Sequence, residues 1–175
     1  MQPNLPTFAL SVRQPWAWAI IHAGKDIENR SWQAINRGLA NRGPIAIHAA
    51  KGMSAAEYIS AREYMLALGV TCPHPAELVR SAIIGHVTIA DIVSKSDSPW
   101  FMGPRGLVLR DPVACNPIAA SGQLGFFKWQ TNLLDTPSSP LPWMTSFESQ
   151  PWMEKLGENT EHERKWHDLF YGEVR

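Results

Sequence analysis

Three charged side chains that could hold a ligand or transfer a proton lie close together in the short sequence KDIENR: Lys25, Glu28 and Arg30. A carboxylate between an ammonium and a guanidinium group can orient a polar ligand, and a desolvated lysine can act as a base. If the protein is an enzyme, Lys25 and Glu28 are therefore the candidate catalytic residues. The alternative is a solvent-exposed ion pair, which contributes about 0–1 kcal/mol to stability.

Tryptophans lie on both sides of this charged sequence and again in a proline-flanked loop. Trp32, Trp100 and Phe101 are candidates for stacking against a nucleobase. Such stacking contributes about 1–3 kcal/mol per base and needs only an aromatic face. The alternative is that these rings pack in the core, as most tryptophans do.

Basic side chains are concentrated in the first third of the chain. Arg30, Arg37, Arg42 and Lys51 could contact phosphates, or could form a solvated charged face. Residues 11–51 hold six basic and two acidic side chains, whereas residues 135–175 hold four basic and eight acidic ones. This asymmetry favours either an anionic partner or docking of the acidic tail on the basic face. The formal net charge of zero argues against coating nucleic acid by bulk charge.

The sequence predicts neither a metal nor a cofactor. It contains no P-loop, GxGxxG, HExxH, GxSxG or CxxC motif, and its histidines are mostly isolated. His48, in the sequence AIHAA, is read as a core histidine rather than as a metal ligand. Cys72 and Cys115 lack metal-ligand spacing and are expected to be reduced thiols.

The elements that must position the charged side chains can be predicted from the pattern. Residues 8–12 read as a strand, and Pro15 suits the first turn of a helix over 15–23 that ends at Gly24. The following extended segment places Glu28, Arg30 and Trp32 on one face, because side chains alternate along a strand.

The rest of the chain is predicted to complete a small barrel. Ser54 and Glu57 form a capping-box pattern that opens a helix over 55–68. The pattern also predicts a loop over 33–42, strands over 45–49, 81–93, 107–115 and 123–129, a helical turn over 76–80, and a last helix over 161–171. Gly85 inside a strand suggests a bulge or close packing.

The fold class predicted is α+β, a small mixed β-barrel of about five or six strands with flanking helices, because the long helices that a parallel doubly wound sheet needs are missing. Residues 1–133 form the barrel domain, and 134–175 form a C-terminal extension packed on it. With 45% apolar residues, no membrane-length apolar run and no signal-peptide pattern, we expect a cytoplasmic globular protein that does not engage membranes.

The sequence ALSVRQPWAWAIIHAGKDIENRSW, followed by RGPIAIHAAK, resembles the ASCH domain family, the module named for its homology to activating signal cointegrator 1. The resemblance covers about residues 7–129, and the first 45 residues carry most of it. The positions that match the family pattern are Gln14, Pro15, Trp16, Ala17, Gly24, Lys25, Glu28, Arg30, Trp32, Arg42 and Gly43.

The resemblance implies a PUA-like barrel with a helix beside a cleft, and binding of nucleic acid, usually RNA. The candidate nucleic-acid-binding residues are Gln14, Trp16, Lys25, Glu28, Arg30, Trp32, Arg42, Lys51 and Trp100. In this interpretation Glu28 orients the two cations or accepts a hydrogen bond from a base amino group.

Enzymatic members of the family suggest an alternative function, a hydrolase. One branch acts on N4-acetylcytidine with a lysine and a threonine three residues later; Lys25 matches the lysine, but Glu28 occupies the threonine position and cannot replace a hydroxyl nucleophile. Another branch is linked to metal-assisted ribonuclease activity. A third possibility is a protein-interaction module that uses the tryptophans of the tail, Trp143, Trp152 and Trp166.

Overall fold

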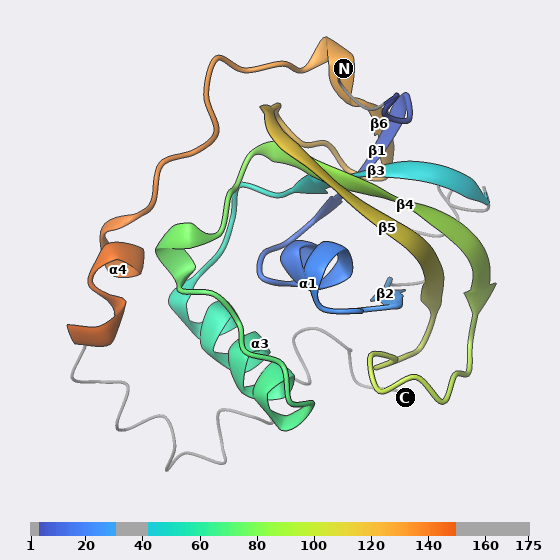
Figure 1. The fold of residues 1–175 in the computed structure, drawn as a ribbon, viewed down its shortest axis with the longest axis horizontal. Helices are drawn as coiled ribbons and strands as arrows, with labels where there is room; N and C mark the ends of the chain where they lie inside the picture. Colours follow the sequence, from blue (N-terminus) through green and yellow to red (C-terminus); the bar gives the residue numbers. More distant parts are fainter. Residues whose placement is uncertain (1–3, 31–41, 150–175) are drawn as a thin grey trace.

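The computed structural model describes residues 4–30 and 42–149. Its centre is a six-stranded mixed sheet that curls into a half-barrel, with helices flanking it, so the predicted α+β class is confirmed (Figure 1). The strands are β1 (Phe8–Val12), β2 (Ile27–Asn29), β3 (Gly43–Ala49), β4 (Ala82–Val93), β5 (Gly106–Ala119) and β6 (Phe126–Lys128). The helices are α1 (Trp16–His22), α3 (Ala55–Ala67) and α4 (Pro142–Thr145), with 3-10 turns at Pro75–Glu77, Trp129–Thr131 and Phe147–Ser149.

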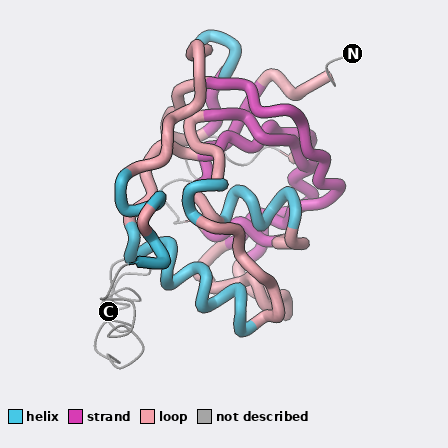
Figure 2. The backbone as a smooth tube through the Cα atoms, turned by 60° about the vertical axis from the view of Figure 1, so that its left-hand side comes forward, coloured by secondary structure: helices cyan, strands magenta, loops and turns pink. Residues whose placement is uncertain are grey.

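The strand order is β2-β5-β4-β3-β1-β6, in which only β1 and β3 run parallel among the strand pairs of the described residues. The order leaves β2 at one end of the sheet and β6 at the other. The curl of the sheet wraps around α1, which lies inside it (Figure 1). The strands and α3 occupy opposite ends of the molecule (Figure 2).

The core inside the curl is built from the alternating apolar residues of the strands and one side of α1. Its buried members include Leu10, Val12, Ile20, Ile21, Ile45, Ile47, Val87, Ile89, Leu107 and Leu109. Each side chain of this size contributes about 1.5–3 kcal/mol when it is fully buried. Since Ala17, Ile20 and Ile21 of α1 belong to this core, the helix is held against β4 and β5.

Two details of the predicted elements are confirmed. Ser54 accepts from the amide of Glu57, whose side chain accepts from the Ser54 amide, so α3 opens with the predicted capping box. The β3–β4 register shifts near Gly85, and an added Cβ there would lie 2.4 Å from the Val113 carbonyl oxygen, so this glycine marks both a bulge and close packing.

Other details differ from the prediction. The strand that was expected to stop at 115 continues to Ala119, although it contains Pro112 and Pro117. It tolerates both prolines because β2 pairs with it only at residues 106–108, so these positions lie on an edge in the described part of the chain. The helical turn expected over 76–80 is a shorter 3-10 turn, Pro75–Glu77. The predicted helix over 161–171 lies outside the described residues.

The first described residues after position 133 run along the outside of the molecule from the region of β6 to α3 (Figure 1). Arg80 holds this segment, because its Nη2 donates to the Ser139 carbonyl and its backbone pairs with Ser138. Met144 and Phe147 are buried at its far end, where Phe147 contacts the ring of Tyr58 edge-on. The domain boundary at 133/134 stays a prediction.

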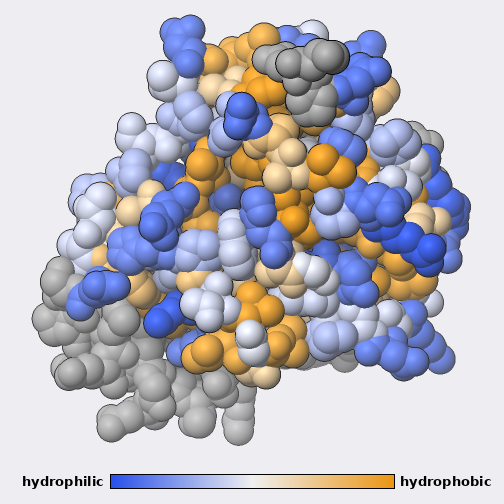
Figure 3. All heavy atoms as spheres, viewed as in Figure 1, coloured by the Kyte–Doolittle hydropathy of each residue, from blue (hydrophilic) through white to orange (hydrophobic). Residues whose placement is uncertain are grey.

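Apolar residues are also exposed on the surface. On the face seen in Figure 3, they gather toward the centre and polar residues surround them. Leu124, which precedes β6, is 89% exposed. Single exposed apolar side chains are normal in folded proteins, so they do not by themselves mark a binding surface.

The outer face of the sheet contains a buried histidine whose charge state links stability to pH. Burial lowers the pKa of His48 below its ordinary value near 6.5. The unfolded chain therefore binds a proton at a higher pH than the folded protein, and we expect stability to fall as the pH drops from about 6.5 toward the folded pKa. Above that pH range His48 is neutral in both states, and its protonation no longer lowers the stability.

Urea unfolding of the wild type and of His48→Gln at about pH 7.5 and about pH 5.5 measures this effect. The wild type should lose more stability on acidification than the variant does. An equal loss in the two proteins would assign the pH dependence to other groups.

Candidate functional site

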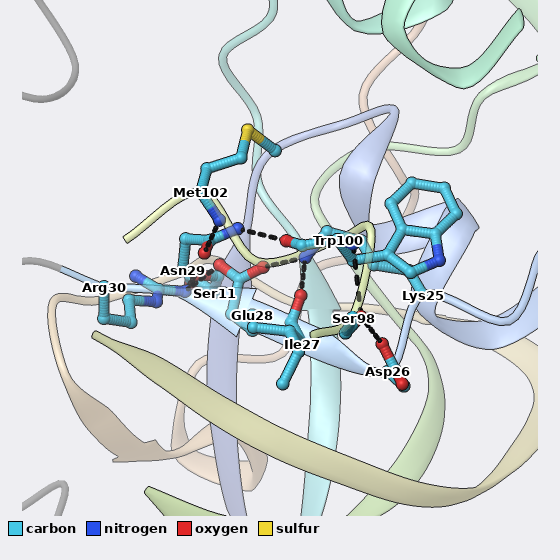
Figure 4. Close-up of polar contacts among 10 residues, drawn as sticks. All are labelled: Ser11, Lys25, Asp26, Ile27, Glu28, Asn29, Arg30, Ser98, Trp100 and Met102. Atoms are coloured by element: carbon cyan, nitrogen blue, oxygen red, sulfur yellow. Dashed lines mark hydrogen bonds and ion pairs between the residues drawn. The ribbon is translucent and has the colours of Figure 1, made fainter. Parts of the chain in front are cut away.

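The three charged side chains singled out in the sequence meet in one ion-pair network (Figure 4). Lys25 Nζ lies 2.9 Å from Glu28 Oε2, and Arg30 Nη2 lies 3.2 Å from Glu28 Oε1. Lys25 also donates to the backbone carbonyl of Ile27. One carboxylate therefore serves two cations, and we call these three residues the charged triad.

The turn after α1 brings Lys25 into this position. Gly24 has a φ of 70°, a left-handed conformation that ends the helix without the strain that a Cβ would cause. The Lys25 amide then donates to the Ala19 carbonyl of α1, and its ammonium group lies 5.9 Å from the centroid of the Trp16 ring. This cation–π contact adds to the stabilisation of a charge that is largely removed from water.

Exposure increases along the charged triad. The side chain of Lys25 is 2% exposed, that of Glu28 10% and that of Arg30 22%. Because burying charges is unfavourable unless they are paired, the inner end of the triad depends on its internal contacts. A ligand in solution would meet Arg30 first.

Arg30 also connects two strands that are far apart in the curled sheet. It follows β2 directly, and its Nη2 donates to the backbone carbonyl of Ser11 on β1 at 2.6 Å. In the strand order, β2 is the first strand and β1 the fifth, so this contact bridges the open side of the half-barrel. The Nε of Arg30 is buried and has no hydrogen-bond partner among the described residues.

Residues that the sequence reading did not single out hold the loop beside the triad. Asn29 accepts from the Met102 amide through Oδ1 and donates to the Trp100 carbonyl through Nδ2 (Figure 4). Ser98 donates to Asp26 Oδ1 at 2.5 Å and accepts from the Trp100 amide. No pattern in the sequence distinguishes these residues from ordinary loop and strand polar residues.

The loop in turn positions an aromatic cluster. Trp100 is 5% exposed and lies 6.3 Å from the ring of Tyr64, which also meets Trp16 edge-on at 6.0 Å. The hydroxyl of Tyr64 donates to the Pro99 carbonyl, and burial raises its pKa, so it remains a neutral donor. Trp100 therefore packs behind the triad, while Trp16 is half-buried beside it.

The other predicted binding residues lie at different places. Gln14 is 2% exposed; its Oε1 accepts from the Trp18 amide and its Nε2 donates to the Val79 carbonyl, so it caps and anchors α1. Arg42 is exposed and pairs with Asp91 on β4. Lys51 is exposed, and its carbonyl accepts from Arg80 Nη1. Trp32 and Arg37 lie outside the described residues.

The described residues contain no group of three or more His, Cys, Asp or Glu side chains that could hold a metal ion. Within the same ranges, none of the helices has the length and apolar character needed to cross a membrane. The candidate site consists of charged and aromatic groups: the Glu28 carboxylate flanked by two cations, next to the Trp16 ring.

The site and the fold together define an α+β protein with a curled six-stranded sheet and an ion-pair network at its open side. A scan against protein-family models found no match to the chain. A search of curated proteins gave no significant match either.

Proposed function

We propose that the protein is an ASCH-type, PUA-like module of the cytoplasm that binds single-stranded nucleic acid, RNA in the first place, at the charged triad. The observation that carries the proposal is the excess of positive charge there. Glu28 is shared between Lys25 and Arg30, so the ion pairs of this network leave one positive charge uncompensated. An anionic ligand compensates such a charge.

The unpaired donor of Arg30 supports a phosphate as that anion. A buried N–H group without a partner is unfavourable by about 1–3 kcal/mol. Arg30 Nε is buried and has no partner among the described residues, so a phosphate oxygen would satisfy it once the atoms that cover it move aside. Arginine suits this role because its planar guanidinium group can donate two parallel hydrogen bonds to one phosphate.

A nucleic acid adds to this a base that can stack. Trp16 is partly exposed and lies next to Lys25, so a base could contact its ring while the neighbouring phosphate contacts Arg30. Trp100 is buried against Tyr64, so in this proposal it fixes the loop and does not contact the base.

The test is binding of a fluorescent single-stranded RNA, with single-stranded DNA and duplex RNA for comparison, between about 50 and 200 mM salt. We expect single-stranded RNA to bind best and affinity to fall as salt rises, because phosphate contacts release counterions. Arg30→Gln should weaken binding by about tenfold or more, which corresponds to a loss of about 1.4 kcal/mol.

The matched control is Arg110→Gln, which removes an exposed arginine of β5 that lies outside the triad. Far-UV circular dichroism shows whether each variant is folded. An equal loss of affinity in both variants would mean that bulk charge drives binding. The absence of binding by the wild-type protein to all three nucleic acids would contradict the proposal itself.

A hydrolase acting on RNA or on a modified cytidine such as N4-acetylcytidine is the second candidate function. The buried 2.9 Å contact between Lys25 and Glu28 favours it, because such a pair can exchange a proton with a bound substrate. Mass spectrometry of both substrates after incubation, with and without a divalent metal, decides the question. Product formed by the wild type but not by Glu28→Gln would support catalysis at the triad.

A further inference from the structure

A second polar cluster lies on the outer face of the sheet, where Ser11 of β1 is the register partner of His48 of β3. Ser11 Oγ lies 2.9 Å from His48 Nδ1. On the other side of the imidazole, Nε2 lies 2.9 Å from the backbone carbonyl of Ala120. The three groups form a line of hydroxyl, imidazole and carbonyl.

The contacts fix which ring nitrogen carries the proton. A carbonyl oxygen only accepts hydrogen bonds, so His48 Nε2 must donate to Ala120. In the neutral imidazole, Nδ1 is then the acceptor, and the hydroxyl of Ser11 donates to it. The burial that lowers the pKa of His48 favours this neutral form. The resting state is therefore a serine hydroxyl hydrogen-bonded to a base.

A serine nucleophile must be accessible and its base is best held rigidly, and the exposure of Ser11 and His48 fits this requirement. His48 is 1% exposed and its ring meets Phe127 edge-on, so the base is rigidly held and shielded from water. Ser11 is partly exposed. Gly122 lies above it, and a Cβ at that position would come within 2.5 Å of Ser11 Oγ and 2.7 Å of His48 Cε1. Residue 122 therefore packs closely against the pair, and only a glycine fits there without a collision with the hydroxyl and the imidazole.

We propose that Ser11 is the nucleophile of an acyl-transfer site, with His48 as its general base and the Ala120 carbonyl as the group that orients the imidazole. The substrate class is a carboxylic ester. This arrangement of nucleophile, base and orienting group is the general logic of serine hydrolases, here with a carbonyl in place of the usual carboxylate.

The proposed reaction proceeds in two balanced steps. Ser11 Oγ attacks the ester carbonyl carbon while its proton moves to His48 Nδ1, and the alcohol leaves with that proton, which gives an acyl-serine. A water molecule then attacks the acyl carbon, gives a proton to His48 Nδ1, and the carboxylic acid departs as Ser11 Oγ takes the proton back. No oxidant, reductant or cofactor is needed.

The proposal is independent of nucleic-acid binding at the triad, since it involves different side chains. The two are adjacent, however, because the backbone carbonyl of Ser11 accepts from Arg30. A negative result for labelling of Ser11 therefore does not contradict nucleic-acid binding, and the reverse also holds, because the two tests use different reagents and different variants.

The experiment is labelling of the full-length protein with an alkyl fluorophosphonate, which modifies activated serines, followed by intact-mass analysis and peptide mapping. We expect one adduct, on Ser11. Ser11→Ala should give no adduct, and His48→Asn should slow labelling by about 100-fold, the lower end of the contribution of a general base. Gly122→Ala should slow it as well, because the added methyl group would collide with the Ser11 hydroxyl and the His48 ring and disturb their contact.

Ser121→Ala is the matched control: Ser121 is a neighbouring exposed serine whose hydroxyl donates to the Asn132 carbonyl rather than to a base. It should be labelled at the wild-type rate. The wild-type result is decisive without any variant, since a wild-type protein that gains no adduct under conditions that fully label a known serine hydrolase overturns the proposal. Equal labelling rates for wild type and His48→Asn would also overturn it and leave the pair the role of joining β1 to β3.

Discussion

Replacing Lys25 with alanine is expected to lower the free energy of unfolding by about 3 kcal/mol, the largest effect of any substitution in the charged triad. The change removes the partner of a carboxylate that is itself largely buried, and it leaves the Ile27 carbonyl without its donor. Removing one member of a buried ion pair lowers stability by about 3–5 kcal/mol. We expect the lower end, because Glu28 keeps its contact with Arg30.

Urea unfolding measures this change, and two further variants separate its causes. Lys51→Ala removes an exposed lysine and should change stability by less than about 0.5 kcal/mol. The double variant Lys25→Met/Glu28→Gln should be more stable than Lys25→Ala, because it leaves neither a buried carboxylate without its lysine nor a large cavity, and the charge that loses its partner is the more exposed Arg30. A loss below about 1 kcal/mol for Lys25→Ala would show that water reaches the carboxylate freely.

Gly85→Val is expected to have the second large effect, a loss of about 1–3 kcal/mol or a failure to accumulate folded protein. A Cβ at this position would lie 2.4 Å from the Val113 carbonyl oxygen and 2.8 Å from Cδ1 of Ile21. The first clash is with backbone, so β4 and β5 must separate to relieve it. The second would push α1 outward, and α1 carries Trp16.

The effect is measured as the midpoint of thermal unfolding of Gly85→Val, compared with that of the control variant Gly52→Val. An added Cβ at Gly52 would meet only the end of the flexible Arg13 side chain, at 3.0 Å, so this control should lose much less stability. Equal losses in the two variants would mean that the β4–β5 pairing adapts to the added volume. The Gly85 variant also tests the dependence of the triad on α1, because nucleic-acid affinity should fall together with stability.

The local part of the fold could be predicted because its determinants lie near one another in the sequence. The capping box of Ser54 and Glu57, the helix end at Gly24 and the alternation in β1 are all signals that span a few residues. The length of β5 was underestimated because the stretch after residue 115, which contains Pro117, reads as a connection between two strands, whereas the tolerance of a proline depends on where β2 stops pairing. That information belongs to the tertiary structure.

The candidate site was predictable in the same limited sense. Alternation along the extended segment placed Glu28 and Arg30 on one face, and their contact follows from it. The joining of Arg30 to Ser11 across the open side of the sheet could not be predicted, since it depends on how the strands curl. His48 was read as an isolated core residue for the same reason, as its partners Ser11 and Ala120 lie far from it in the chain.

The two prolines of β5 have a consequence for how copies of this protein meet at high concentration. A long strand with an unpaired edge is a template on which a strand of another molecule can assemble, which leads to aggregation. Pro112 and Pro117 interrupt the row of amide donors that such assembly requires. Replacing both with threonine would therefore be expected to favour intermolecular β-sheet, visible as thioflavin fluorescence, while the native half-barrel stays intact.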